Sequence, residues 1–324
     1  MTLKNAICMA AAMLCLNVAQ AQEFPGNRPV SAVVPFAAGG PTDKVARELA
    51  MVMSRHLGAQ VIIENAGGAG GTIGARKVAQ SRGDGYTVLI HHIGMSTAPA
   101  LYRKLGFDPL KDFEMIGEIA DVPMVLVANK ALPPSSLKEL VPYLKTNAKT
   151  ASLANAGVGS ASHLCGLLFM HAVQTELTTV PYKGTAPALT DLLGGQVNLM
   201  CDQTTNLAGQ LKAGAVKTYA AMQPQRIEAF KDIPSAREEG LAGIEVKIWH
   251  AMYAPKGTPA PVVEKLSAAL QAAVQDKGFR AKMAELGAEA VPAARAQPDS
   301  LRAHLGAEIA KWTPVIRAAG VYAD

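Results

Sequence analysis

Short apolar runs alternate along the chain with longer segments whose apolar residues recur every three or four positions. Residues 30–34 form such a run, and the apolar residues of positions 45–57 follow it at the spacing of one helical face. The same order of strand and helix recurs after residues 61–63 and after residues 86–91. Alternating strands and helices are typical of parallel sheets covered by helices, so the sequence predicts an α/β fold.

A second unit with the same pattern is predicted in the middle of the chain. Residues 122–128 are expected to form a strand that leads into it, and residues 245–253 a strand that leads back. Between them, Ser136 and Glu139 have the spacing of a capping box, which predicts the start of a helix. We therefore expect two lobes with parallel-rich sheets, flanked by helices and joined by two crossings. The predicted domains are residues 22–124 with 245–324, and residues 125–244.

The loop at residues 35–43 has the composition of an anion-binding site. Gly39 and Gly40 form a turn, and Pro41 suits the first helical position, because its missing N–H would have no partner there anyway. Asp43 then falls in the first turn, where a carboxylate suits the helix dipole. The unpaired N–H groups at the start of such a helix can bind an anion. The alternative is an ordinary connection between a strand and a helix.

Three later loops repeat this arrangement of glycine and a hydroxyl ahead of a helix: residues 70–74, 157–163 and 183–185. In open parallel sheets ligands bind at the carboxyl ends of the strands, where such loops gather. Together the four loops predict a clamp for a small carboxylate between the two lobes. Taken alone, each hydroxyl is also explained as a helix cap. The hydroxyls are those of Thr42, Thr72, Ser160 and Thr185.

Several titratable side chains are candidates for chemistry, and each has a structural alternative. His91 and His92 are adjacent in a predicted strand and should point to opposite faces, which argues against a shared metal ion and makes His92 the better cleft candidate. His163 could donate to a ligand carboxylate or cap a helix. Asp43 and Asp202 are expected to start helices as caps rather than to form an acid/base pair.

The motifs of common enzyme classes are missing from the sequence. Residues 68–73 lack the last glycine of a dinucleotide-binding fingerprint, and residues 159–161 lack the frame of a nucleophile elbow. The chain also has no P-loop, no H-E-x-x-H motif and no Cys-x-x-Cys pair. The sequence therefore favours a binding protein over an enzyme, with no cofactor and no bound metal.

The N-terminus and the composition indicate the compartment in which the protein works. Residues 1–21 combine Lys4, an apolar run and a small-x-small end, which predicts a secretory signal peptide and a soluble, exported mature chain. The formal charge of +5 comes from scattered basic residues, without the stripe typical of nucleic-acid binding. After the signal is removed Cys165 and Cys201 remain, either as buried apolar groups or as one disulfide.

Several motifs together resemble the Bug family, the periplasmic receptors of tripartite tricarboxylate transporters. The resemblance covers essentially the whole mature chain and implies a two-lobed periplasmic binding protein, type II-like, that closes on a small carboxylate. It also implies a membrane permease as partner. The motifs are Val34-Pro35-Phe36-Ala37-Ala38-Gly39-Gly40-Pro41-Thr42-Asp43, residues 61–65 with 68–74, Gly83-Asp84-Gly85-Tyr86-Thr87, Val180-Pro181-Tyr182-Lys183-Gly184, residues 192–197 and residues 254–259.

The same resemblance assigns ligand contacts to both lobes. It implies that residues 36–43 and 70–74 hold one carboxylate, and that the second lobe contributes residues 157–163, Thr185 and Asp202. Residues 91–99 depart from the commonest family pattern and resemble the subset that binds aromatic carboxylates such as terephthalate. Citrate-like tricarboxylates and acidic amino acids are the open alternatives. The predicted ligand-binding residues are Phe36, Gly40, Thr42, Asp43, Gly71, Thr72, His92, Ser96, Ser160, His163, Thr185 and Asp202.

We therefore expect a periplasmic solute-binding protein that captures a di- or tricarboxylate for a tripartite tricarboxylate transporter. A monomer that binds no nucleic acid is expected. The alternatives are a periplasmic hydrolase or isomerase that acts on such acids, and a ligand-sensing subunit of a signalling system.

Overall fold

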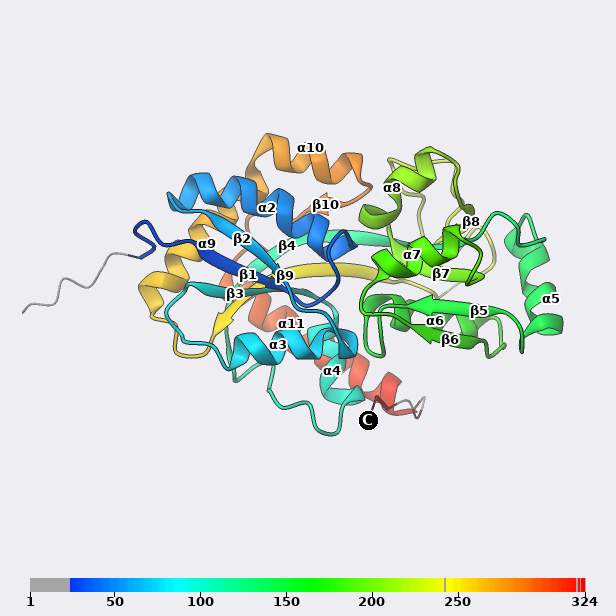
Figure 1. Cartoon of the computed structure of the whole chain (residues 1–324), viewed down its shortest axis with the longest axis horizontal. Helices are drawn as coiled ribbons and strands as arrows, with labels where there is room; N and C mark the ends of the chain where they lie inside the picture. Colours follow the sequence, from blue (N-terminus) through cyan, green and yellow to red (C-terminus); the bar gives the residue numbers. More distant parts are fainter. Residues whose placement is uncertain (1–23, 242, 319, 321, 324) are drawn as a thin grey trace, which may run out of the picture.

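Two α/β lobes share one mixed sheet in this computed structural model, which describes residues 24–241, 243–318, 320 and 322–323 (Figure 1). Within these residues ten strands form a continuous sheet in the order β2-β1-β3-β9-β4-β7-β5-β6, with β8 and β10 both paired to β4. The predicted signal peptide, residues 1–21, lies outside the described residues.

The first lobe is built on parallel strands that are covered by helices on both faces. Helix α2 buries the stripe that the sequence predicts, including Val45, Leu49 and Leu57, against β1. The strands are β1 (Val30–Val34), β2 (Val61–Asn65) and β3 (Thr87–His92), with the short β10 (Glu289–Ala290) at β4. One face carries α2 (Pro41–Leu57), α9 (Ala260–Gln275) and α10 (Lys277–Glu285). The other carries η1 (Ala69–Gly71), α3 (Thr72–Ala79), α4 (Gly94–Leu101) and α11 (Pro298–Ala318).

The second lobe repeats this plan with shorter strands. Its parallel strands are β5 (Ser152–Asn155), β6 (Thr178–Pro181) and β7 (Leu199–Gln203). Its helices are α5 (Leu137–Asn147), α6 (Ala161–Ala172), α7 (Thr185–Leu193) and α8 (Thr204–Lys212), and β8 (Lys217–Ala221) pairs antiparallel with β4. The predicted capping box is present in part at α5: the Ser136 side chain accepts the Glu139 N–H, while the Glu139 carboxylate accepts the N–H of Ser135 rather than that of Ser136.

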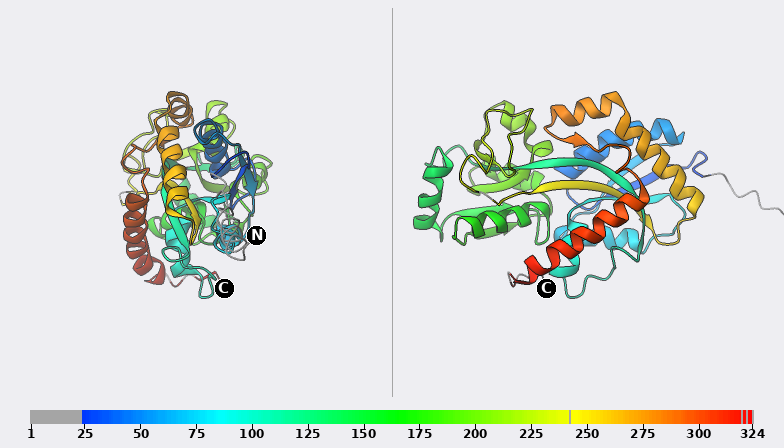
Figure 2. Two further views of the ribbon diagram at one scale, coloured as in Figure 1. Left: turned by 90° about the vertical axis from the view of Figure 1, so that its left-hand side faces the viewer. Right: turned by 180° about the vertical axis from the view of Figure 1, so that it is seen from behind.

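Two long strands, β4 (Phe113–Ala128) and β9 (Lys247–Pro255), run from one lobe to the other (Figure 2, right). Up to Pro123, β4 pairs antiparallel with β9; from Met124 onward it pairs with β7 and β8. This change of partners supports the predicted division near residue 124, and the exact domain bounds remain a prediction.

The structure departs from the sequence expectations at three places. Strand β4 begins at Phe113 rather than near residue 122. The sequence does not reveal its first half, because register shifts after Met115 and after Glu118 interrupt the alternation of a strand. Asp202 does not start a helix: β7 continues to Gln203 and α8 begins at Thr204. Residues 92–96, for which the sequence predicts a loop ahead of a short helix, are already helical from Gly94.

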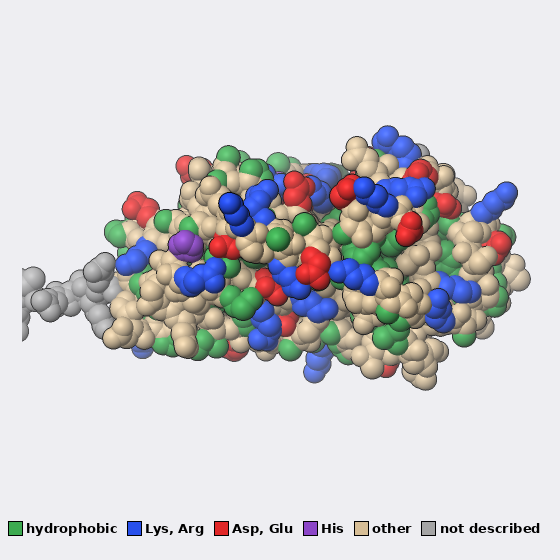
Figure 3. Space-filling view, turned by 90° about the horizontal axis from the view of Figure 1, so that it is seen from above, with side chains coloured by type: hydrophobic (Ala, Val, Ile, Leu, Met, Phe, Trp, Pro, Cys, Tyr) green, Lys and Arg blue, Asp and Glu red, His purple; other side chains and the backbone are tan. Residues whose placement is uncertain are grey.

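The surface carries charges of both signs. On the face seen from above in Figure 3, basic and acidic side chains are interspersed, so this face presents no basic stripe. Among the described residues, none of the helices combines the length and the apolar character needed to cross a membrane.

Candidate functional site

A small cavity lies between the lobes. The segments that follow β1, β5 and β6 reach it, together with the last residues of β3 and β7, as expected for a site at the carboxyl ends of parallel strands. The first lobe lines it with Phe36, Pro41, Thr42 and His92. The second lobe lines it with Ala156, Ser160, Ala161, Ser162, Thr185, Asp202 and Gln203.

Half of the predicted ligand-binding residues line this cavity. The six that do are Phe36, Thr42, His92, Ser160, Thr185 and Asp202. Gly40, Asp43, Gly71, Thr72, Ser96 and His163 lie outside the lining. Gln203, which directly follows the predicted Asp202, was not predicted from the sequence, and Ser162 was included only within the range 157–163. The polar character of the first helical turn after Ser160 was the signal that could have found Ser162.

Asp43 holds the first-lobe loop in shape instead of facing the cavity. Its Oδ2 accepts the Gly39 N–H at 2.9 Å and pairs with Arg47 Nε at 2.8 Å, while Oδ1 accepts from Asn65 Nδ2 at 2.9 Å. Asn65 also donates to the Phe36 carbonyl at 3.1 Å. Burial alone would raise the pKa of Asp43, but these partners lower it, so the carboxylate stays ionised and committed to the loop.

Other residues outside the lining have similar supporting contacts. The Thr72 hydroxyl donates to the Ala69 carbonyl at 2.9 Å, and the Ser96 hydroxyl to the Ile93 carbonyl at 2.7 Å. Gly71 has a φ of +100°, and a Cβ there would lie 2.7 Å from His91 Nε2. A glycine is therefore required where this loop passes over the histidine.

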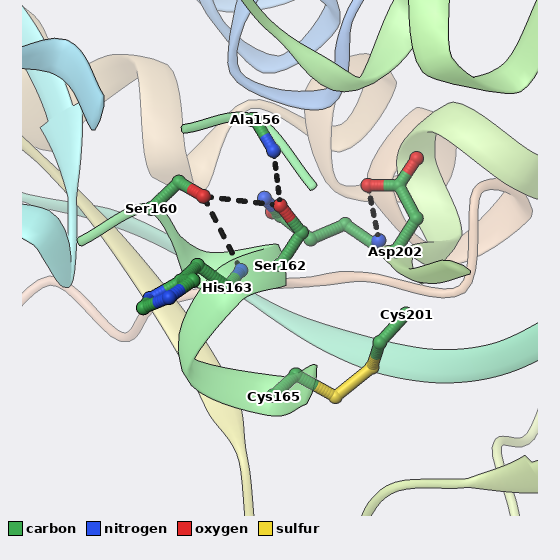
Figure 4. The surroundings of a disulfide bond; sticks show 8 residues. Ala156, Ser160, Ser162, His163, Cys165, Cys201 and Asp202 are labelled. Carbon is green, nitrogen blue, oxygen red and sulfur yellow. Dashed lines mark hydrogen bonds between the residues drawn. A yellow bond between two sulfur atoms is a disulfide. The ribbon is translucent and has the colours of Figure 1, made fainter. Parts of the chain in front are cut away.

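The starts of α2 and α6 bring backbone donors to the cavity from opposite lobes. Thr42, Ala161 and Ser162 lie in first helical turns, where N–H groups have no partner within the helix. The Ser160 hydroxyl caps α6 by accepting the His163 N–H at 3.3 Å, and it lies 3.1 Å from the Ser162 hydroxyl (Figure 4). Amides, hydroxyls and helix dipoles of this kind are suited to hold a carboxylate.

His91 and His92 lie against the same aromatic ring, so the expectation that they point to opposite faces is wrong. His92 stacks on Phe36 with ring centroids 4.6 Å apart, and His91 meets the same ring edge-on at 5.4 Å. Both residues belong to β3 and pair with Ala251 and His250 of β9, but they stand at its C-terminal end just before α4, where their rings meet with centroids 4.9 Å apart. As the sequence suggested, His92 is the one that lines the cavity.

The buried histidines around the cavity are neutral. Burial, assisted by His91 and His250, holds the pKa of His92 well below 6.5. Its Nδ1 accepts the Gly94 N–H at 3.0 Å, so the neutral ring carries its proton on Nε2 and offers a donor. Burial also lowers the pKa of His250, whose Nε2 lies 3.3 Å from the Thr42 hydroxyl, to about 4. Within the described residues, no three His, Cys, Asp or Glu side chains are placed to share a metal ion.

Asp202 is the one charged side chain among the described residues that line the cavity. It accepts the Gln203 N–H at 2.8 Å and Asn206 Nδ2 at 2.5 Å. Burial raises the pKa of Asp202 to about 6, and hydrogen bonds from Asn206, Gln203 and Thr185 offset only part of that effect.

A disulfide joins two of the elements that supply cavity residues. Cys165 on α6 and Cys201 on β7 are bridged, with Cα atoms 6.1 Å apart (Figure 4). The bridge lies close in sequence to Ser162 and directly precedes Asp202. It therefore fixes the start of α6 relative to the end of β7, and it resolves the two alternatives for these cysteines in favour of a bond.

Direct contacts between the lobes surround the cavity, so the structure is a closed form. Ala37 N donates to the Lys183 carbonyl at 3.1 Å, and the Thr97 hydroxyl donates to the Gly159 carbonyl at 3.1 Å. On the side of α8, Lys44 Nζ donates to the Asn206 carbonyl at 3.2 Å. These bonds can form only when the two lobes are together.

The sequence and fold match known receptor proteins. Residues 45–321 match the TctC model, described as the tripartite tricarboxylate transporter family receptor. The solved structure of the periplasmic binding protein BugD is 52% identical with a TM-score of 0.89, covering 91% of this chain and 98% of that one. MatC from Rhodopseudomonas palustris with bound malate is 40% identical with a TM-score of 0.86, covering 89% and 99%. An R. palustris protein with adipate is 35% identical with a TM-score of 0.87, covering 93% and 99%.

Proposed function

This chain belongs to the TctC family of tripartite tricarboxylate transporter receptors, of which the Bug proteins are members, and on this premise we propose that it captures a small organic dicarboxylate between its lobes. The family consists of periplasmic receptors for small carboxylates, so the chain is a binding protein and not an enzyme. We also propose that the ligand is a dicarboxylate, that the protein serves a particular tripartite tricarboxylate transporter, and that residues 1–21 are a signal peptide.

One observation carries the proposal: helix starts from both lobes meet at one cavity that no described lysine or arginine lines. The Thr42 region of α2 can hold one carboxylate, and the Ser160–Ser162 region of α6 can hold the other. Two anionic ends bound by opposite lobes would stabilise closure, because both sets of contacts exist together only in the closed form. Malate and adipate, which are bound in the two relatives, are both dicarboxylates.

An aromatic ligand such as terephthalate has weaker support. The Phe36 ring, which is the candidate stacking surface, already has His92 on its face and His91 at its edge. A flat ring would have to displace one of these histidines or bind elsewhere in a small cavity. Aliphatic dicarboxylates do not depend on stacking against Phe36, and two relatives bind malate and adipate, so we propose them as the first class to test.

A thermal-shift screen of the purified mature protein tests this function. Succinate, L-malate, adipate, citrate and terephthalate are compared, and each hit is measured by calorimetry. An aliphatic dicarboxylate present at about 100 times its Kd should stabilise the protein by about 2.7 kcal/mol. Chromatography should recover the ligand unchanged. Absence of binding to every acid would refute the proposed function, and binding of terephthalate alone would overturn the aliphatic assignment.

A further inference from the structure

The cavity contains a buried carboxyl group at the place where an anionic ligand is expected. Asp202 lies at the end of β7, lines the cavity and is only 1% exposed. Its oxygens accept the Gln203 N–H and the Asn206 amide, and neither contact neutralises a charge. A ligand carboxylate bound by the α6 start would occupy the same small enclosed space.

The charged and titratable groups around Asp202 offset its charge only in part. From α2, Lys44 Nζ donates to the Asn206 carbonyl, and Asp43 is committed to Arg47. The histidines on neighbouring elements are neutral because burial lowers their pKa values: His92 on β3, His163 on α6 and His250 on β9. Lys44 attracts Asp202 only through space.

Two ionised carboxylates in such a cavity would repel each other, which costs free energy. Like charges in a buried site raise the pKa of one partner until the pair holds a proton between them. Protonated Asp202 would donate its O–H to the ligand carboxylate, which converts repulsion into a charge-assisted hydrogen bond. Resting on the proposed function, we propose that Asp202 determines the ligand specificity of the site by taking up one proton when a dicarboxylate binds.

The surroundings of Asp202 already favour this protonation. Burial raises its pKa to about 6. A ligand carboxylate can only raise it further, while opening of the cleft hydrates the group and lowers it. At pH 7 to 8, Asp202 is therefore ionised in the free protein and protonated in the closed complex. Dicarboxylate affinity should then fall about tenfold for each pH unit in this range, since one proton is coupled to binding.

Calorimetry measures this proton directly. L-malate and adipate are titrated into the mature protein at pH 7 and pH 8, in phosphate and in Tris, whose ionisation enthalpies differ. Both ligands are ionised at these pH values. We expect about one proton taken up per ligand and the tenfold fall in affinity between the two pH values.

Two matched variants test whether Asp202 is the group that takes up the proton. Asp202→Asn keeps a hydrogen-bond donor but cannot ionise, so it should bind L-malate with no proton uptake and equal affinity at both pH values. Asp191→Asn makes the same change in the second lobe outside the cavity, where Asp191 accepts from the Tyr182 hydroxyl, and should retain the proton uptake. Thermal melts establish that both variants are folded.

Several outcomes would overturn the proposal. Wild-type binding of either acid without proton uptake would do so, as would undiminished uptake in Asp202→Asn. L-aspartate provides a further test. If it binds more tightly than L-malate and without proton uptake, and if this binding is lost in Asp202→Asn, then ionised Asp202 pairs with the ligand ammonium group, which would also overturn the proposal. Absence of heat with every acid would refute the proposed function itself, which separates that failure from failure of the proton proposal.

Discussion

Gly70 of the first lobe lies directly against the carbonyl oxygen of Val158 in the second lobe, so that a Cβ built on Gly70 would fall 1.9 Å from that oxygen. The Tyr102 hydroxyl lies 2.8 Å from the same oxygen and 2.8 Å from the Ala69 carbonyl. This contact belongs to the closed form, because it joins the two lobes beside the cavity. An alanine at position 70 would keep the lobes apart.

The first prediction follows from this contact. Gly70→Ala should weaken L-malate binding at least tenfold and remove the ligand-induced compaction that we expect of the wild type in small-angle scattering. Gly214→Ala is the matched control, because Gly214 has a φ of +60° against +61° at Gly70 but no atom within 4 Å of an added Cβ. Both variants share the backbone strain, so equal losses of affinity would show that strain, and not the lobe contact, is responsible.

The second prediction separates ligand binding from helix capping. Ser160 caps α6 and Ser136 caps α5, and each hydroxyl accepts the N–H three residues on at 3.3 Å. Replacing either by alanine should cost about 1 kcal/mol of the free energy of unfolding. Only Ser160 lines the cavity, so only Ser160→Ala should also lower ligand affinity in calorimetry. Equal affinities in the two variants would remove Ser160 from the site.

The parts of the fold that could be predicted are those specified by neighbouring residues. The β1 strand, the glycine turn and the α2 stripe follow from local apolar spacing, and the predicted strand at residues 30–34 has the bounds of β1. The antiparallel centre of the sheet could not be predicted in the same way. Strand β4 pairs with β9, more than 100 residues away, and its two register shifts hide the alternation of a strand.

The candidate site, like the fold, could be predicted only where neighbouring residues in the sequence specify it. Asp43 and Asp202 are the same residue type in similar sequence positions, yet Asp43 is committed to Arg47 and Asn65 while Asp202 faces the cavity. Asn65 lies 22 positions from Asp43, at the end of β2 whereas Asp43 is on α2, so no local pattern distinguishes the two carboxylates. Likewise, the contact of both His91 and His92 with the Phe36 ring depends on where β3 ends, which periodicity does not specify.

The third prediction concerns the disulfide. The bridge between Cys165 and Cys201 closes a loop with a sequence separation of 36. Reduction should lower the free energy of unfolding by about 3–4 kcal/mol, because the unfolded chain regains loop entropy. Guanidinium denaturation with and without dithiothreitol measures the loss. A variant with both cysteines replaced by alanine should not respond to the reductant, and a wild-type protein equally stable in both conditions would contradict the prediction.

The fourth prediction concerns an ion pair between α11 and β4, one of the two strands that connect the lobes. His304 Nδ1 on α11 lies 3.0 Å from Glu118 Oε1 on β4, and Glu118 is buried. The Glu118 carboxylate raises the pKa of His304 above 6.5, in spite of partial burial. The stabilisation from this pair is therefore fully present below pH 6.5 and is lost as the pH rises through the raised pKa.

Replacement of His304 should accordingly matter more in mild acid than in mild base. We expect His304→Gln to lower the free energy of unfolding by about 1 kcal/mol relative to wild type at pH 5.5, and by clearly less at pH 8.5, in urea denaturation. His171→Gln, at an exposed position of α6, is the control and should change the free energy of unfolding by no more than about 0.5 kcal/mol at either pH. A larger deficit for His304→Gln at pH 8.5 than at pH 5.5 would reverse the sign of the linkage and show that neutral His304 is the form that the fold stabilises.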